Sequence, residues 1–174
     1  MKATSGEASF NGRNIRDALA SGGAGNSIGY CPQADSLDSF LSPVEHLRIY
    51  AHLRGIPQQS VEAMVAQSIV KFQLQPHAQM PVEALSRGNR RKLCLAIAML
   101  GNPSLILLDE PTVNYFISSQ VPLSTNRFSY TQSGLDPQSR RYICQTIQDA
   151  IRDRRSILLT SHVSQVAFVL IKLF

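Results

Sequence analysis

The sequence predicts an α/β fold in which a mostly parallel sheet is flanked by helices. One observation is a fully apolar run at residues 105–108 that ends in two carboxylates, because a continuous apolar run is typical of a buried parallel strand. A second apolar run, Ser156–Thr160, has the same character. A helical run from Arg90 to Leu100 precedes the first strand. Gly101-Asn102-Pro103 ends this helix, since Gly tolerates a left-handed cap and Pro cannot continue a helix.

Two acids, Asp109 and Glu110, stand at the end of the first of these strands. Open α/β sheets bind their ligands at the carboxyl ends of the strands. Paired carboxylates at such a place are suited to hold a metal ion and to polarise a water molecule. The alternative is that Asp109-Glu110-Pro111 only starts a turn.

The composition indicates one globular domain. The chain has 174 residues, of which 44% are hydrophobic and 17% are charged, as expected for a soluble protein with a core of its own. Three separated cysteines without a CxxC pattern favour reduced cytosolic thiols over disulfides or a zinc site. We expect no signal peptide at Met1 and no membrane span, since no apolar run approaches the roughly 18 residues that a bilayer requires.

The formal charge of +5 raises the possibility of a nucleic-acid surface. The basic residues concerned lie on or beside predicted helices, at Arg90-Arg91-Lys92, Arg140-Arg141, Arg152, Arg154 and Arg155. Aromatic residues do not interleave with them, as they would in many nucleic-acid sites. We therefore expect solvated helix faces and no nucleic-acid partner.

The first part of the chain is predicted to hold short strand-like pieces at residues 3–15 and a strand at Ser27–Tyr30, which Cys31-Pro32-Gln33 follows. Between them lies a Gly-rich loop at residues 21–26. A phosphate-binding loop requires GxxxxGK[ST], in which backbone N–H groups wrap the phosphates and Lys reaches their oxygens. None of the four lysines is followed by Ser or Thr. The Gly-rich loop is therefore predicted to be an ordinary surface loop.

Two helices are predicted in the middle of the chain. Ser42 is the expected N-cap of the first, with Pro43 at its first helical position and Glu45 completing a capping box, and this helix runs to about Leu53. The second helix is predicted from Gln59 to Leu74. Its apolar side would comprise Val61, Met64, Val65, Ile69, Val70 and Phe72.

The last part of the chain is predicted to contain a helix from Gln138 to about Asp153 and then the strand that ends before Ser161-His162. Residues 163–174 carry no acid and are mostly apolar, which would make them an aggregation liability at a soluble terminus. The segment 113–132 also lacks acids and shows no clear period, so it is predicted to be a loop or disordered.

An ordered series of motifs resembles the nucleotide-binding domain of an ABC transporter. Leu85-Ser86-x-Gly88-Asn89 is similar to the signature motif, and the apolar run that ends in Asp109-Glu110-Pro111-Thr112 is similar to Walker B. Subfamily A, the lipid-exporter-like branch, has patterns similar to those at residues 28–33, 45–47, 54–56, 91–93 and 158–162. These matches cover most of Thr4 to His162 in the family's order, which makes them specific together.

The resemblance implies a P-loop NTPase-type sheet with a helical subdomain at about residues 40–100. It also implies that the site binds ATP and Mg²⁺. Asp109 would hold the magnesium, and Glu110 would be the general base for the attacking water. Gln33 would contact the magnesium or this water, and His162 would contact the γ-phosphate.

The resemblance also implies a second nucleotide-binding domain, paired head to tail with this one. Ser86, Gly88 and Asn89 would act on the nucleotide that the partner domain holds, because a helix N-terminus binds phosphate. Asp136 would lie in the D-loop at the same interface. Arg87 replaces the family's first Gly in the signature, so its side chain would crowd the phosphate, require a strained backbone, or contact the phosphate itself.

Two features depart from the family's pattern. Walker A lies a short way upstream of the equivalent of Thr4 in the family, so we expect the domain to be incomplete at both ends and to begin just after this loop. The 20-residue segment 113–132 interrupts a pattern that otherwise runs from Thr112 to Ser133. The segment begins with Val113, and valine codons begin with GT; it ends with Gln132, and one glutamine codon ends with AG. These are the first and last nucleotides of an intron, so a translated intron is one hypothesis. A real insertion that displaces Asp136 is the other.

These motifs lead to two main functional hypotheses. The first is an ATPase domain at the cytosolic face of a membrane, which couples ATP hydrolysis to the transport of a lipid-like substrate through a separate transmembrane domain. The second is a non-catalytic fragment or pairing module that lacks its own Walker A and cannot hydrolyse ATP. A soluble ABC ATPase of repair or translation is a third, against which the subfamily A pattern in the helical region argues.

Overall fold

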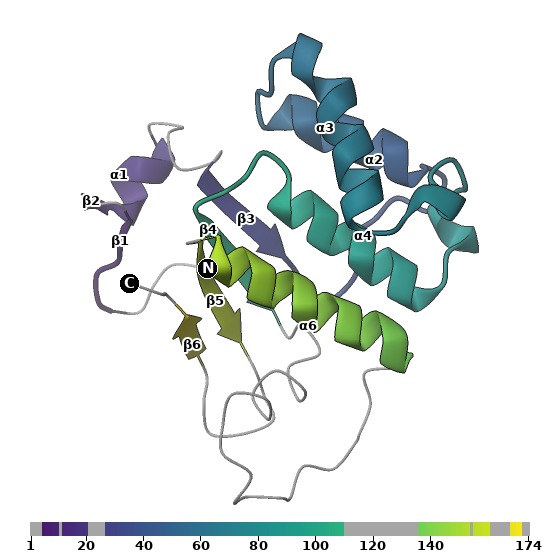
Figure 1. Cartoon of the computed structure of the whole chain (residues 1–174). Coiled ribbons are helices and arrows are strands. Elements are labelled where there is room, and N and C mark those ends of the chain that lie inside the picture. Colours follow the sequence, from purple (N-terminus) through teal and green to yellow (C-terminus); the bar gives the residue numbers. More distant parts are fainter. Residues whose placement is uncertain are drawn as a thin grey trace, which may run out of the picture.

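The computed structural model describes residues 5–10, 12–20, 27–109, 136–153, 155–160 and 168–171. Its main sheet has the order β3-β4-β5-β6, with the strands at Ile28–Cys31, Leu105–Asp109, Ser156–Thr160 and Phe168–Ile171. The first three strands are parallel and the fourth is antiparallel to β5 (Figure 1). The predicted α/β class with a mostly parallel sheet is confirmed.

A small hairpin precedes this sheet. Its strands, β1 at Ser9–Phe10 and β2 at Arg13–Asn14, pair in the antiparallel direction, and helix α1 follows at Ile15–Ala20. Figure 1 shows this unit beside the main sheet, on the side away from the large helices.

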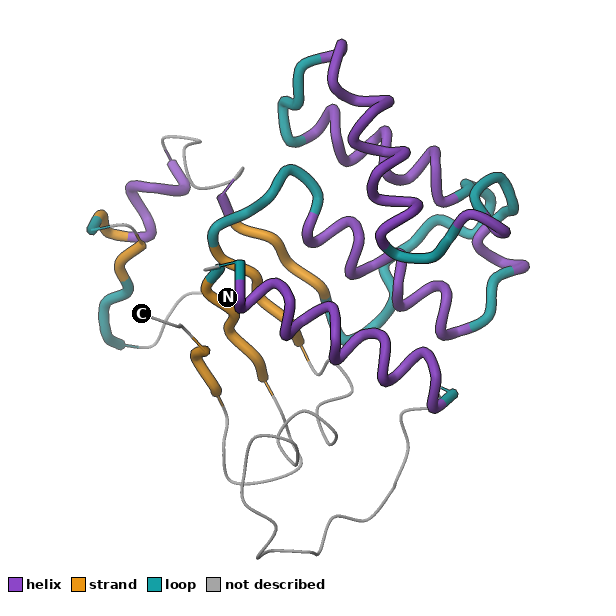
Figure 2. The backbone as a smooth tube through the Cα atoms, in the orientation of Figure 1, coloured by secondary structure: helices purple, strands orange, loops and turns teal. Residues whose placement is uncertain are grey.

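The larger helices gather on one side of the sheet, as the tube in Figure 2 shows. They are α2 at Pro43–Leu53, α3 at Gln58–Lys71, α4 at Arg87–Met99 and α6 at Pro137–Arg152, with short 3-10 turns at Gln75–His77 and Val82–Ala84. The predicted capping box of α2 is confirmed, because the Ser42 hydroxyl accepts the Glu45 N–H and the Glu45 carboxylate accepts the Ser42 N–H. Among the described residues, none of the helices is long and apolar enough to cross a membrane.

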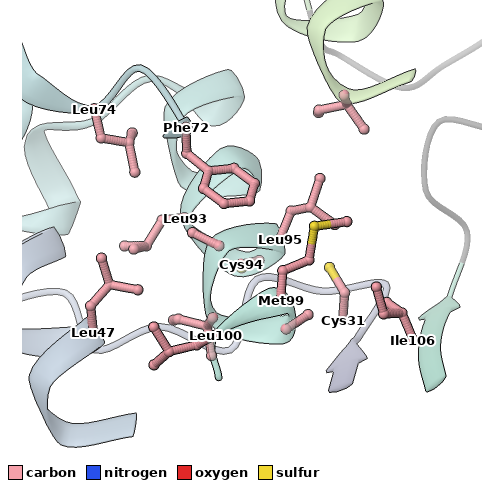
Figure 3. Packing of buried hydrophobic residues seen from close by; sticks show 14 of the residues in the cluster. Cys31, Leu47, Phe72, Leu74, Leu93, Cys94, Leu95, Met99, Leu100 and Ile106 are labelled. Atoms are coloured by element: carbon pink, nitrogen blue, oxygen red, sulfur yellow. The ribbon is translucent and has the colours of Figure 1, made fainter. Parts of the chain in front are cut away.

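Helix α4 is the centre of the packing. It contacts β3, α2 and α6, and Figure 3 shows its side chains directed both toward the helices, near Leu47 and Leu74, and toward the strands, near Cys31 and Ile106. Gly29 in β3 allows this close approach, because a Cβ atom there would lie 1.9 Å from the carbonyl oxygen of Ala98.

Two predictions about the surface were wrong. Arg91 and Lys92, which were expected on a solvated helix face, are only 6% and 8% exposed, because α4 is covered on several sides. Val70 was expected on the apolar side of the second helix and is 59% exposed. Val61, Val65 and Ile69 of the predicted apolar side are buried, as expected, and they are spaced by four along α3.

Candidate functional site

The parallel register brings two predicted site residues to one edge of the sheet. The ladder between β3 and β4 ends at Cys31 and Leu108. Gln33 follows β3 at this edge, and Asp109 is the last residue of β4. The Gln33 residue is exposed and Asp109 is half-buried, so the edge presents an amide and a carboxylate at the carboxyl ends of neighbouring strands, where open α/β sheets bind ligands.

Asp109 is held from two sides. Its carboxylate accepts a hydrogen bond from the hydroxyl of Thr160, the last residue of β5. Its backbone carbonyl accepts a hydrogen bond of 3.1 Å from the Arg91 guanidinium of α4. The predicted residues Glu110 and His162 lie outside the described residues.

Arg91 belongs to this edge, although the sequence analysis placed it on a solvated surface. Its guanidinium donates to the carbonyl oxygens of Pro32 and Gln33, as well as to that of Asp109. The sequence contained one signal, since Arg91 precedes Leu95 by four residues and so shares a helix face with an apolar residue. That signal was hidden by the two basic residues that flank Arg91.

The signature residues form the first turn of α4. Ser86 is the N-cap, and its hydroxyl accepts the N–H of Asn89 at 3.2 Å. This cap starts the helix at Arg87, three residues before the Arg90 start that was predicted from the sequence. Arg87 is not among the described non-glycine residues with a positive φ, so the strained backbone considered for this position does not occur.

Asp136 caps helix α6 directly beside the signature. Its carboxylate accepts the N–H of Ser139 at 2.8 Å, and the hydrogen bonds from Ser139 keep the pKa of Asp136 below its ordinary value. A Cβ atom at Gly88 would lie 2.3 Å from the Ser139 hydroxyl and 2.9 Å from the Asp136 carboxylate. The N-termini of α4 and α6 therefore adjoin, and Asp136 meets the signature turn that holds Ser86, Gly88 and Asn89.

The predicted site residues that the structure describes thus fall into two groups. Gln33 and Asp109 lie at the carboxyl edge of the sheet, and the signature turn lies with Asp136 at two helix N-termini. The partial positive charge of a helix N-terminus favours an anion such as phosphate. Arg91 connects the two groups, since it is three residues after Gly88 on the same helix.

The cysteine near the sheet edge is not a nucleophile. Burial raises the pKa of Cys31 to about 11, and the nearby Arg91 charge opposes this rise only in part. Cys94 is also buried, and desolvation raises the pKa of its thiol as well. Because the thiolate is the reactive form, these thiols are inert parts of the core.

Comparison with known sequences assigns the family. The sequence profile of the family described as "ABC transporter" matches residues 1–113. The chain is 40% identical over 146 residues to human ATP-binding cassette sub-family A member 13, with 84% of this chain and 2% of the relative covered. It is 39% identical over 159 residues to the bovine retinal-specific phospholipid-transporting ATPase ABCA4, with 91% of this chain and 6% of the relative covered. The chain therefore spans only a small part of these relatives' length.

A solved structure agrees with this assignment at the level of the fold. A dimeric ATP-binding cassette in a post-hydrolysis state, bound to ADP and Pi, superposes with a TM-score of 0.68 at 18% identity, covering 91% of this chain and 63% of that chain. The predicted P-loop NTPase-type fold is thereby confirmed. The chain belongs to the ABC transporter family, and the relatives to which it is similar are members of subfamily A.

Proposed function

We propose that this chain is an ATP-binding and ATP-hydrolysing domain of a subfamily A transporter, in which hydrolysis at the cytosolic face of the membrane drives the transport of a lipid. The observation that carries the proposal is the sheet edge at which the register places Gln33 next to the end of β4 at Asp109. A relative whose name describes it as a phospholipid-transporting ATPase supports the lipid substrate. The transmembrane domain would belong to the same transporter.

The residues at this edge fit a nucleotide-bound Mg²⁺. No group of three His, Cys, Asp or Glu residues that could hold a metal occurs within the described ranges. Mg²⁺ does not need such a group, because it keeps several waters and uses one or two carboxylates together with phosphate oxygens. Asp109 would supply the carboxylate and Gln33 an amide oxygen. The bound Mg²⁺ would neutralise charge on the phosphates.

The chain's own residues would then position the reactants. The Thr160 hydroxyl fixes the Asp109 carboxylate, so this ligand needs no reorganisation when the metal binds. We assign Glu110 as the base that accepts a proton from the attacking water, and His162 as a donor to the γ-phosphate. In the sequence, Glu110 directly follows β4 and His162 comes two residues after the end of β5.

The second group of residues would act on a partner. We assign Ser86, Gly88 and Asn89 to the nucleotide held by a second nucleotide-binding domain in a head-to-tail pair, with Asp136 at the same interface. The positive end of α4 supports this assignment, because it favours phosphate oxygens. The exposed Arg87 at the first helical position would either contact that phosphate or crowd it.

The second hypothesis is a pairing module that cannot hydrolyse ATP. A GxxxxGK[ST] loop supplies backbone donors and a Lys for the β- and γ-phosphates, and residues 1–174 contain no such loop. A domain of this kind would keep its signature face and would contribute it to the nucleotide of another domain.

Calorimetric titration of the 174-residue chain with Mg²⁺–ATP separates the two hypotheses. A variant that lacks residues 113–132 is the matched control, since this deletion restores the family's sequence between Thr112 and Ser133. Micromolar affinity in the chain excludes the pairing module. If neither protein binds ATP, the chain has no nucleotide site of its own and the hydrolytic function is refuted for it.

A further inference from the structure

We propose that Arg91 is a positioning residue that ties the Gln33 loop and the Asp109 end of β4 to the signature helix, so that the three move as one unit. This inference rests on the proposed function for its catalytic consequence, whereas its structural part stands on the contacts of Arg91 alone. The Gln33 loop is defined here as residues 33–41, between β3 and the cap of α2.

One guanidinium makes all of these contacts. Nη1 of Arg91 donates to the carbonyl oxygen of Pro32 and, at 3.4 Å, to that of Gln33. Nη2 donates to the carbonyl oxygen of Asp109 at 3.1 Å. The carboxylate of Asp35, in the same loop, lies 3.7 Å from Nη1. The two nitrogens of the fork therefore contact different segments: Nη1 contacts the residues that follow β3, and Nη2 contacts the last residue of β4.

The fork lies just beyond the last ladder pair of β3 and β4. The ladder of β3 and β4 ends at the pair Cys31 and Leu108. The next residue after β3 is Pro32, which has no N–H to donate. Beyond this point Arg91 links the two segments by hydrogen bonds, because a planar guanidinium presents several donors in a fixed geometry. A lysine has one nitrogen and would not span both strand ends.

Burial shows that Arg91 is not an ordinary surface base. A guanidinium that is only 6% exposed carries a large desolvation cost, which hydrogen bonds and a nearby opposite charge must offset. Three carbonyl oxygens and the Asp35 carboxylate provide these partners. Removal of the side chain would leave these carbonyl oxygens without this donor.

The other end of the Gln33 loop is anchored to the helical part. The Asp38 N–H donates to Nε2 of the buried His46 of α2 at 3.0 Å. The carbonyl oxygens of Ser39 and Leu41 accept the N–H groups of Glu83 and Val82, each at 3.0 Å. A displacement of α2 would thus be passed along the loop to Arg91, and from there to Asp109 and the first turns of α4.

The test is hydrogen–deuterium exchange of the 174-residue chain without nucleotide, for wild type, Arg91→Met and Arg91→Lys. Arg54→Met is the matched control, because Arg54 is also a partly buried arginine that donates to backbone carbonyls, those of Leu100 and Ala98, but at the other end of α4. Exchange is followed at the amides of residues 33–41 and of the first turns of α4.

We expect Arg91→Met to raise exchange in the Gln33 loop about tenfold, since the start of this segment loses the guanidinium that links it to the end of β4. Arg91→Lys should raise it less but measurably, because one ammonium cannot bridge both strands. In wild type, amide exchange in the Gln33 loop and at the start of α4 should depend on the urea concentration in the same way, because the two segments open together. In Arg91→Met the two segments should show different urea dependences. Arg54→Met should lower the melting temperature without a selective change in the loop.

Unchanged exchange in the loop of Arg91→Met, or an equal rise in Arg54→Met, would overturn the proposal. If Arg91→Met does not fold, Arg91→Lys decides by the same criterion. In a chain that turns over ATP, the positioning role also requires kcat to fall about 10- to 100-fold, with KM within about twofold of wild type. Because exchange is measured without nucleotide, it distinguishes failure of this inference from failure of the proposed function.

Discussion

At the scale of single residues, two of the glycines that the structure describes lie where a Cβ atom has no room. At Gly29 a Cβ would meet the backbone carbonyl of Ala98 at 1.9 Å, and at Gly88 it would meet the side-chain hydroxyl of Ser139 at 2.3 Å. A side chain can rotate away from a new atom, whereas a carbonyl within a helix moves only with the helix. The two positions therefore differ in the kind of neighbour as well as in the distance.

We predict that Gly88→Ala lowers the free energy of unfolding by about 1–3 kcal/mol, as overpacking usually does, and that Gly29→Ala lowers it more. Urea unfolding followed by circular dichroism measures both. Adding Ser139→Ala to Gly88→Ala removes the closest contact and should recover part of the loss. An equal or smaller loss at Gly29 would show that α4 can shift away from β3.

Residue roles that depend on near neighbours in the sequence were predictable, and roles that depend on distant contacts were not. Ser42 and Glu45 form the predicted capping box because both partners lie within one turn. Arg91 was misassigned because its partners follow β3 and end β4. Its position in a basic tripeptide gave no information about the strand ends that it would meet.

At the scale of elements, the cap of α2 links stability to pH. The hydrogen bond from the Ser42 side chain, and then that from its backbone, lower the pKa of Glu45. A carboxyl whose pKa is lower in the folded than in the unfolded state stabilises the fold above its unfolded pKa. This stabilisation is lost as the pH falls through the folded pKa.

Ser42→Ala should therefore destabilise the protein by about 1 kcal/mol near neutral pH. The difference from wild type should start to shrink as the pH falls below the unfolded pKa of Glu45, about 4, and should be lost as the pH falls through its lower folded pKa. Urea unfolding at a series of pH values measures this difference. Gln59→Ala, an exposed change in the first turn of α3, is the control and should leave the pH dependence unaltered. If the loss of unfolding free energy in Ser42→Ala stays constant with pH, the cap does not link stability to the ionisation of Glu45.

The type of each main element was predictable from the sequence, and the ends were less so. The strand Ser156–Thr160 was placed correctly because apolar runs mark buried strands. Helix α4 begins three residues earlier than expected, since Ser86 caps it and Arg87 and Gly88 accept helical geometry. The strand β6 was not expected, although Phe168–Ile171 is also an apolar run, because the residues after His162 were interpreted only as an apolar tail; their antiparallel pairing with β5 is a tertiary contact.

At the scale of the whole molecule, three thiols from three different elements share one core. Cys31 lies in β3, Cys94 in α4 and Cys144 in α6, and all are buried. Burial raises the pKa of each thiol, so the reactive thiolate is suppressed until the core opens.

We predict that a thiol reagent at about pH 8 labels all three cysteines only on global unfolding. The urea midpoint for labelling should coincide with that from circular dichroism. Mass spectrometry of the labelled peptides identifies each site. Labelling of Cys144 at lower urea than Cys31 would show instead that α6 leaves the core before the sheet unfolds.

The sequence predicted the carboxyl edge of the sheet as a site because strand ends and acids are local features. It did not predict that Asp136 would adjoin Gly88, since the contact between α4 and α6 arises only when both helices pack on the same core. Lys92 was expected in solvent for the same reason. Its ammonium group lies 4.9 Å from the centre of the Tyr142 ring of α6, and this neighbour comes from a distant part of the sequence.

We propose that Asp109, at the carboxyl edge of the sheet, holds the metal ion of a bound nucleotide. Electron paramagnetic resonance of Mn²⁺ with ATP, in place of Mg²⁺, tests it in wild type, Asp109→Asn and Asp153→Asn, the last removing an exposed carboxylate at the end of α6. We expect a protein-bound Mn²⁺–ATP signal in wild type and Asp153→Asn, and its loss in Asp109→Asn. An equal signal in all three proteins, or none in wild type, would contradict it.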